Sequence, residues 1–294
     1  MLLETEREKK PSVLGHMVGG LRSALSYRMR SLARSRVPLA GYTENRHQIA
    51  LIEALSDDDL TRLNDLLQWN AFTVDSRGRR FGGLSWAGKR DRPQEVPDRR
   101  ILLLNQRFAL LDKHVLEVGC FEGIHTAGLC QFARQVTAVD GRIENVTKTI
   151  VRTAFYGYRP TVFLHDVEQY PAPVDFLRAD VLHHVGVLYH LRDPVRHLLD
   201  LGHFIRLGMM LDTHYALPEE TGFSYVVNGR QYPYKQFGEQ GAGDVFSGLY
   251  PHSKWLTLDV ITDLLKESGF ARVELVETRL ERNGPRVLLF ASRQ

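Results

Sequence analysis

Four residues between positions 117 and 140 have the types and spacing to bind a nucleotide-like ligand. Glu117 lies in a short apolar run, Gly119 and Gly123 bracket the turn after it, and Asp140 ends a second, β-branched run. Glycines at the carboxyl end of a strand let a ligand approach the backbone, and a carboxylate ending the next strand can accept both ribose hydroxyls. Glu117 would repel a pyrophosphate, so the pattern departs from the G-x-G-x-x-G dinucleotide fingerprint and favours a ligand with an ammonium and a sulfonium.

This pattern resembles the first two motifs of the class I S-adenosylmethionine-dependent methyltransferases. The resemblance implies a methyltransferase, an enzyme of the transferase class, with S-adenosyl-L-methionine as its cofactor. It implies cofactor contacts at Glu117, Gly119, Cys120, Phe121, Gly123, Asp140, Gly141, Asp166, Val167 and Val185. At Asp166 an acidic side chain can accept a hydrogen bond from the adenine amine, and at Val167 a backbone N–H can donate to the ring. Asp166 could equally cap a helix.

Alternating strands and helices must position these residues. Strands are expected at 115–118, 136–139, 161–164, 179–185 and 208–213, and helices at 100–111, 124–133, 144–156, from Pro194 with Asp193 as N-cap, and from Thr257 to Gly269. A final antiparallel hairpin is expected at 272–278 and 286–291 around Asn283-Gly284. The pattern predicts an α/β fold, a Rossmann-like seven-stranded methyltransferase sheet with one antiparallel strand.

The chain before this domain has a different character. Residues 1–97 are expected to form a helical N-terminal extension and a loop, and residues 98–294 the S-adenosylmethionine-binding domain. The segment 14–36 predicts a basic amphipathic helix, which either packs on its own domain or lies on a membrane surface or on RNA phosphates. Ser56 is expected to cap a second helix, and the glycine- and arginine-rich segment 72–100 to be irregular.

The fourth expected strand leads into a second and more specific resemblance. The segment 185–198, VGVLYHLRDPVRHL, is similar to the bacterial tRNA wobble-uridine carboxymethyltransferase family, and the likeness extends to Gly123-Ile124-His125, Leu211-Asp212-Thr213 and Arg286. The resemblance implies carboxy-S-adenosylmethionine as the cofactor, with Tyr189 contacting the transferred group. It further implies a tryptophan and a lysine that hold the extra carboxylate, for which Trp86 and Lys89 are candidates. Because their sequence context differs from the family's, we favour transfer of an ordinary methyl group.

Catalytic candidates are the imidazoles and phenols near expected strand ends. Methyl transfer is an in-line displacement at an activated carbon, so a base is needed only if the acceptor loses a proton. His214, just beyond the fifth strand, is the first candidate base, followed by Tyr189 and His190, although His190 could instead anchor its loop. Tyr189, Tyr215 and Arg286 are expected to contact the acceptor, with Arg286 either pairing with an acidic group of the acceptor or simply exposed.

The segment 216–255 is an insertion rich in aromatic residues between the fifth strand and the last helix. Its aromatic residues are Phe223, Tyr225, Tyr232, Tyr234, Phe237, Phe246 and Tyr250. We expect it to form a cap over the acceptor, the alternative being a surface excursion that packs on itself. Aromatic walls suit a planar or sugar-containing acceptor and also a flipped base.

Composition narrows the class of protein. The 294 residues carry a net charge of +3, no apolar run approaches the roughly 20 residues that span a bilayer, and the first residues lack a secretory h-region, so we expect a cytoplasmic protein. Only two cysteines, Cys120 and Cys130, are present and no ligands stand at zinc spacing, so we expect no metal.

Three functions remain open from the sequence. The preferred one is methyl transfer to oxygen or nitrogen of a small-molecule acceptor. The alternative is a tRNA-modifying enzyme that transfers a methyl or carboxymethyl group to a wobble uridine. The third, less favoured because Glu117, Gly119, Gly123 and Asp140 are intact, is a catalytically silent cofactor-binding protein. The sequence does not set the oligomeric state.

Overall fold

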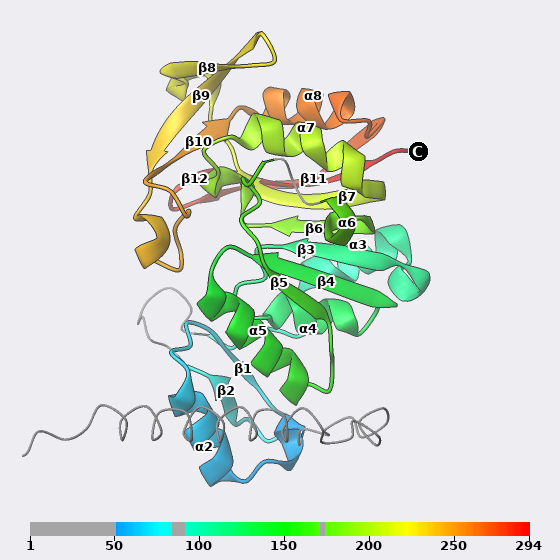
Figure 1. The fold of residues 1–294 in the computed structure, drawn as a ribbon, viewed down its shortest axis with the longest axis vertical. Coiled ribbons are helices and arrows are strands. Elements are labelled where there is room, and N and C mark those ends of the chain that lie inside the picture. Colours follow the sequence, from blue (N-terminus) through cyan, green and yellow to red (C-terminus); the bar gives the residue numbers. More distant parts are fainter. Residues whose placement is uncertain (1–50, 84–91, 171–173) are drawn as a thin grey trace, which may run out of the picture. The chain divides into compact units, whose positions relative to one another are not determined.

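The computed structural model describes residues 51–83, 92–170 and 174–294 (Figure 1). The basic segment 14–36 lies outside the described residues, as do Trp86 and Lys89. Within the described part of the chain, no helix combines the length and the apolar character needed to cross a membrane.

A seven-stranded sheet in the order β11-β12-β7-β6-β3-β4-β5 forms the centre of the structure (Figure 1). Its strands are β3 (His114–Val118), β4 (Gln135–Asp140), β5 (Thr161–Leu164), β6 (Ala179–Val185), β7 (Ile205–His214), β11 (Arg272–Glu281) and β12 (Gly284–Ser292). Strands β3 to β7 pair in parallel, whereas β12 is antiparallel to both of its neighbours. The expected Rossmann-like sheet with one antiparallel strand is therefore confirmed.

Helices cover both faces of the sheet. They are α3 (Arg99–Phe108), α4 (Ile124–Cys130), α5 (Ile143–Phe155), α6 (Val174–Leu177), α7 (Pro194–Phe204) and α8 (Leu258–Glu267), with the 3₁₀ turns η2 (Leu110–Asp112) and η3 (Leu188–His190). Ile101 of α3 and Leu129 of α4 belong to one buried apolar layer, and Leu198 of α7 belongs to a second layer with residues of α8. The expected N-caps are confirmed at Asp193 and Thr257, whose side chains accept backbone N–H groups of α7 and α8.

Residues 51–83 form a small unit that packs on α5. It contains η1 (Ile52–Ala54), α2 (Asp57–Leu66), β1 (Phe72–Val74) and β2 (Arg80–Gly82), and Ser56 caps α2 as expected. The expectation that 72–100 is irregular is wrong, because β1 and β2 pair as an antiparallel hairpin and α3 begins at Arg99. The buried guanidinium of Arg152 in α5 donates to the carbonyls of Ala71 and Phe81 and so holds this hairpin. The domain boundary near residue 98 stays a prediction.

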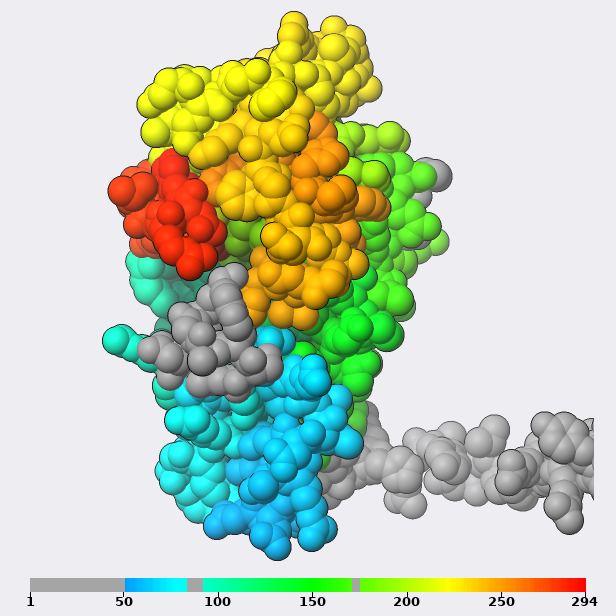
Figure 2. Space-filling model, turned by 90° about the vertical axis from the view of Figure 1, so that its left-hand side faces the viewer, coloured from blue at the N-terminus to red at the C-terminus, as the bar shows by residue number. Residues whose placement is uncertain are grey.

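The segment after β7 forms a cap with its own three-stranded antiparallel sheet, in the order β10-β9-β8. It comprises η4 (Pro218–Glu220), β8 (Phe223–Val227), β9 (Arg230–Gly238), η5 (Gly241–Gly243) and β10 (His252–Leu256). We call residues 239–251, between β9 and β10, the strap. Figure 2 shows the cap in yellow and gold beside the red tip of the β11–β12 hairpin.

Candidate functional site

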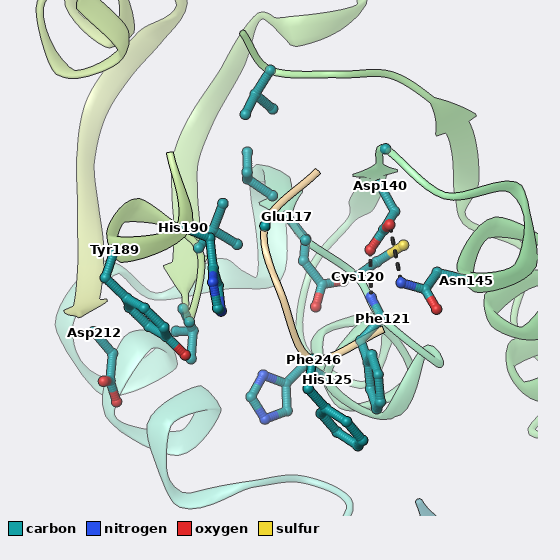
Figure 3. Close-up of a pocket in the computed structure, with 18 of the residues that line it drawn as sticks. Glu117, Cys120, Phe121, His125, Asp140, Asn145, Tyr189, His190, Asp212 and Phe246 are labelled. Atoms are coloured by element: carbon teal, nitrogen blue, oxygen red, sulfur yellow. Dashed lines mark hydrogen bonds between the residues drawn. The ribbon is translucent and has the colours of Figure 1, made fainter. Parts of the chain in front are cut away.

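A cavity of about 600 Å³ opens at the carboxyl edge of β3, β4 and β6 (Figure 3). Chain order along the sheet reverses between β3 and β6, and such a switch point is where open α/β sheets bind ligands. Of the cofactor-binding, substrate-binding and catalytic residues expected from the sequence, those lining it are Glu117, Gly119, Cys120, Phe121, Asp140, Gly141, Asp166, Val167, Val185, Tyr189, His190 and Arg286. Gly123, His214 and Tyr215 are not among the lining residues.

The turn after β3 needs its two glycines for different contacts. Gly119 has φ +75°, and a Cβ there would lie 2.3 Å from a methyl of Val187, in the loop after β6. Gly123 has φ +77°, and a Cβ there would lie 2.8 Å from the Cα of Thr149 in α5. Gly119 therefore lets two loops approach at the cavity, whereas Gly123 lets α4 pack on α5.

Asp140 ties the loops after β3 and β4 together. Its Oδ2 accepts the N–H of Phe121, and its Oδ1 accepts the N–H of Arg142 and the side-chain amide of Asn145, each at 3.0 Å (Figure 3). Burial raises the pKa of the Asp140 carboxyl, against the effect of these hydrogen bonds. Asn145 was missed from the sequence, where it is one polar residue in an amphipathic helix.

Glu117 is a buried carboxyl at the floor of the cavity. It is 1% exposed, and the hydroxyl of Thr126 donates to its Oε2 at 2.6 Å. Burial raises its pKa to about 8. A cation brought close to this carboxyl would favour the ionised form, so the site is suited to a positively charged group.

Asp166 joins the edge of β5 to the strap. Its Oδ1 accepts the N–H of Glu168 at 2.9 Å in a turn, and the described residues 167–170 are not helical, so Asp166 is not the helix cap foreseen as the alternative. Its Oδ2 accepts the hydroxyl of Tyr250 at 2.6 Å. Asp166 and Val167 also line the cavity, where they could contact adenine. That contact stays a prediction.

The strap is held against the cavity by one arginine at the start of α5. One Nη of Arg142 donates to the carbonyls of Gly241, Asp244, Ser247 and Gly248, at 2.9 to 3.2 Å. The backbone N–H of the same arginine donates to Asp140. The strap is therefore coupled to the carboxylate that was assigned from the sequence to the ribose.

Few of the cap's aromatic residues reach the cavity. Phe246 of the strap lines it and packs on Phe121, with ring centres 5.6 Å apart. Tyr225, Tyr232 and Tyr234 instead pack against the apolar layer that contains α7 and α8. These three tyrosines therefore do not contact the acceptor site, and they pack on the main core and not only on their own segment.

His190 pairs with a carboxylate that the sequence did not identify. Its Nδ1 lies 2.9 Å from Oε1 of Glu239 in the strap, and Glu239 also accepts the hydroxyl of Ser247 at 2.6 Å. Burial raises the pKa of Glu239, but the hydrogen bonds from His190 and Ser247 outweigh it and leave the pKa below its ordinary value. No local spacing points to Glu239, because its partner comes from the loop after β6.

His214 and Tyr215 do not line the cavity. His214 is 4% exposed, its Nδ1–H donates to the carbonyl of Pro285 at 3.1 Å, and its ring stacks on Trp255. Burial lowers the pKa of His214. Its ring meets Tyr189 edge-on, so it supports the tyrosine that lines the cavity.

A buried carboxylate organises the wall opposite the β4 loop. Asp212 is fully buried, and it pairs with Arg279 at 2.9 Å, with Arg100 at 3.4 Å and with Arg286. The side chain of Arg286 is only 11% exposed and its guanidinium carbon lies 5.4 Å from the ring centre of Tyr189. The expectation of a simply exposed Arg286 is wrong, because Asp212 holds it inside the protein.

Similarity to named sequences is confined to part of the chain. No protein-family model matches it. The tRNA U34 carboxymethyltransferase of Marinobacter nauticus is 33% identical over 107 residues, 35% of this chain and 32% of that protein. The enzyme of the same name from Methylococcus capsulatus is 32% identical over 125 residues, 41% of this chain and 38% of that protein. The chain thus spans well under half the length of these curated relatives.

Solved structures match over a larger share of the chain. The N-terminal domain of EvdMO1 with S-adenosylhomocysteine bound has a TM-score of 0.67 at 23% identity, over 81% of this chain and 96% of that one. The same domain in the presence of S-adenosylhomocysteine and D-fucose has a TM-score of 0.66 at 22% identity, over 82% and 98%. With the strand order and the glycine turn, this likeness shows that the chain has the fold of the class I S-adenosylmethionine-dependent methyltransferases.

Proposed function

We propose that the chain is an S-adenosylmethionine-dependent methyltransferase that acts on oxygen or nitrogen of a small-molecule acceptor. The observation that carries the proposal is Asp140, which ends β4 at the cavity and accepts N–H groups from two ligand-edge loops. S-adenosylhomocysteine in the similar domain of EvdMO1 supports the same cofactor here.

The cavity residues fit this cofactor by charge. Glu117 is a buried carboxyl on the floor of the cavity, suited to an ammonium group. Asp140 already accepts two hydrogen bonds on Oδ1 and one on Oδ2, so a lone pair of Oδ2 remains to accept a ribose hydroxyl. When bound, the cofactor supplies a methyl group already activated by its sulfonium.

The chain's contribution to the transfer is to position the acceptor and remove its proton. His190 lines the cavity, and Glu239 accepts its Nδ1–H. In the neutral imidazole Nε2 then keeps its lone pair, and Glu239 stabilises the imidazolium that forms when Nε2 takes a proton. We therefore prefer His190 to His214 as the base, since His214 does not line the cavity.

The acceptor is a small polar molecule in this proposal. Tyr189 offers an aromatic face and a hydroxyl at the wall formed with Asp212 and Arg286. D-fucose, present with the similar domain of EvdMO1, is a small polar molecule of this kind and makes sugars the first acceptors to test.

The alternative is modification of a tRNA wobble uridine. It is favoured by the four curated relatives of that name and by the convergence of Arg286 and Tyr189 at the cavity. The mass of the cofactor that co-purifies separates the two functions, because carboxy-S-adenosylmethionine is heavier by one carbon dioxide.

Calorimetric titration with S-adenosylmethionine and S-adenosylhomocysteine tests the proposal. We expect saturable binding of both at one site, and methyl transfer to at least one of a panel of sugars and phenols. Failure to bind either molecule would contradict the cofactor assignment. Tighter binding of the carboxylated cofactor, with transfer to tRNA, would instead establish the alternative.

A further inference from the structure

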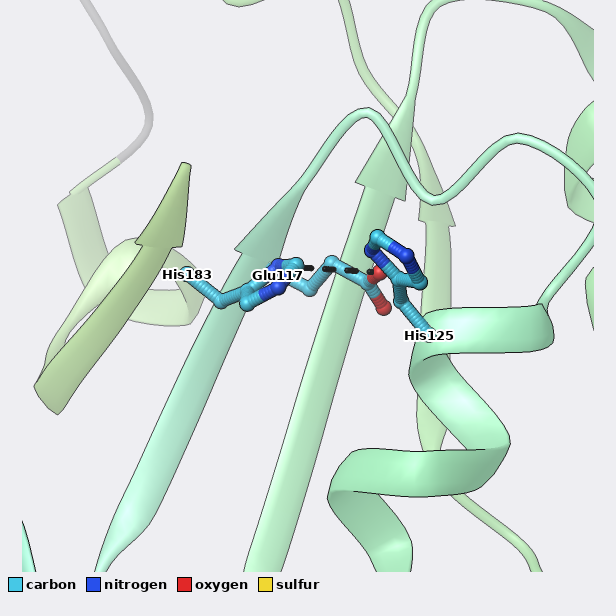
Figure 4. A group of neighbouring side chains, drawn as sticks. All are labelled: Glu117, His125 and His183. Atoms are coloured by element: carbon cyan, nitrogen blue, oxygen red, sulfur yellow. Dashed lines mark ion pairs between the residues drawn. The ribbon is translucent and has the colours of Figure 1, made fainter. Parts of the chain in front are cut away.

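Three side chains that are far apart in the sequence meet at the floor of the cavity. Glu117 of β3, His125 of α4 and His183 of β6 each offer one ligand atom, and these atoms lie within 4.8 Å of one another (Figure 4). Glu117 and His183 are partners in the β3–β6 ladder. The rings of His125 and His183 meet edge-on with centres 5.1 Å apart, so the fold itself sets the arrangement.

His183 has no hydrogen-bond partner among the described residues. It is 1% exposed, and both of its ring nitrogens are buried without a bond. The nearest carboxylate oxygen of Glu117 is 3.9 Å from its Nδ1, too far for a hydrogen bond. Leaving a buried polar group unpaired costs about 1–3 kcal/mol, so a metal ion bound by this imidazole would relieve that cost.

Neighbouring residues orient the other two side chains, Glu117 and His125. The hydroxyl of Thr126 donates to Oε2 of Glu117 at 2.6 Å. Nε2 of His125 lies 3.6 Å from Oδ2 of Asp98 and 3.0 Å from Nη2 of Arg100, so these two residues position the ring. Carboxylates commonly lie behind metal-bound histidines and orient their rings, and Asp98 is placed to do so for His125.

We propose that Glu117, His125 and His183 bind one divalent transition-metal ion. Two imidazoles and a carboxylate are donors that suit Zn²⁺, Fe²⁺ and Mn²⁺. Bonds of about 2.1 Å bring neighbouring ligands roughly 3–3.5 Å apart, so the side chains close on the ion by small rotations. Glu117 and His125 line the cavity, so the remaining coordination positions open toward it and can take water or an acceptor oxygen.

This site goes beyond the proposed function and is tested with the metal alone. Protein stripped with EDTA is titrated with Zn²⁺ and Mn²⁺ by calorimetry, and Co²⁺ serves as a spectroscopic probe. We expect one bound ion, with affinity at least tenfold lower in His125→Ala and in His183→Gln. His203→Ala, at an exposed histidine of α7, is the matched control and should bind as the wild type does.

The outcomes separate this site from other metal ligands. Circular dichroism and thermal melting in EDTA show whether each variant folds. If His183→Gln does not fold, the metal affinity of His125→Ala alone decides the test. Absence of binding in the wild type would overturn the proposal. Binding that survives both substitutions would do the same, because it would place the ion elsewhere, for example at a cysteine.

Discussion

Oε1 of Glu239 lies 2.9 Å from Nδ1 of His190 and so joins the strap to the loop after β6. A carboxylate only accepts hydrogen bonds, so Nδ1 carries a proton, and in the neutral imidazole Nε2 therefore keeps a lone pair. The strap therefore helps to cover the cavity and also fixes the tautomer of an imidazole that lines it.

Replacing His190 should slow transfer without loosening the cofactor. A positioned general base contributes typically 10²–10⁴-fold, so we expect His190→Gln to lower kcat by about that factor for an acceptor that must lose a proton. Steady-state kinetics with the best acceptor from the panel measures it, with His203→Gln as control. An unchanged kcat in His190→Gln would remove the base assignment.

Replacing Asp140 should weaken the cofactor. Asp140→Asn loses the charge that strengthens the ribose hydrogen bonds, and we expect a loss of roughly 2–4 kcal/mol in binding free energy. Calorimetry with S-adenosylhomocysteine measures it. Asp263→Asn, at an exposed position of α8, is the matched control. Equal affinity in wild type and Asp140→Asn would show that Asp140 only holds the loops together.

The strap should slow release of the cofactor product. Tyr250→Phe removes the hydroxyl that donates to Asp166 at 2.6 Å and leaves the ring in place. A hydrogen bond of this kind contributes about 1 kcal/mol, so we expect S-adenosylhomocysteine to dissociate roughly fivefold faster. Stopped-flow displacement measures the dissociation rate, with Tyr158→Phe as the control, because Tyr158 follows α5 and does not line the cavity. The two variants behaving alike would mean that the strap does not gate the cavity.

Arg286 discriminates between the two candidate functions. Asp212 and Glu281 already hold its guanidinium, and the uncarboxylated cofactor offers it no anion. We therefore expect Arg286→Ala to leave the affinity for S-adenosylmethionine almost unchanged. Calorimetry with both cofactors decides: tighter binding of the carboxylated form by the wild type, lost in Arg286→Ala, would favour carboxymethyl transfer.

Local patterns were enough to predict the sheet, because each strand and helix carries its own periodicity and each cap lies next to its helix. Asp193 and Thr257 are caps of this kind. Contacts that depend on packing could not be found this way. Arg152 holds the β1–β2 hairpin from a helix far along the chain, and Glu239 reaches His190 only after the cap has folded. The same holds for His183, whose neighbour Glu117 is set by strand pairing.

A buried histidine pair beneath the sheet should make stability depend on pH. Nε2 of His184 lies 2.9 Å from Nε2 of His197, so one donates, the other accepts, and both are neutral. Burial lowers the pKa of His197 to about 4 from an ordinary value of 6.5, and His165 and Asp166 are the titratable neighbours on its other side.

Between pH 6.5 and 4, therefore, His197 binds a proton in the unfolded chain but stays neutral in the folded chain. The contribution of His197 to the free energy of unfolding is fully present above pH 6.5. Below pH 6.5 it falls by about 1.4 kcal/mol per pH unit. His197→Gln removes the titration, so its urea-unfolding free energy should decline less steeply than that of the wild type from pH 7 to 5. Comparing the two slopes cancels other groups, including Glu117, whose raised pKa acts in the opposite direction. Parallel profiles would show that His197 is not held neutral in the folded protein.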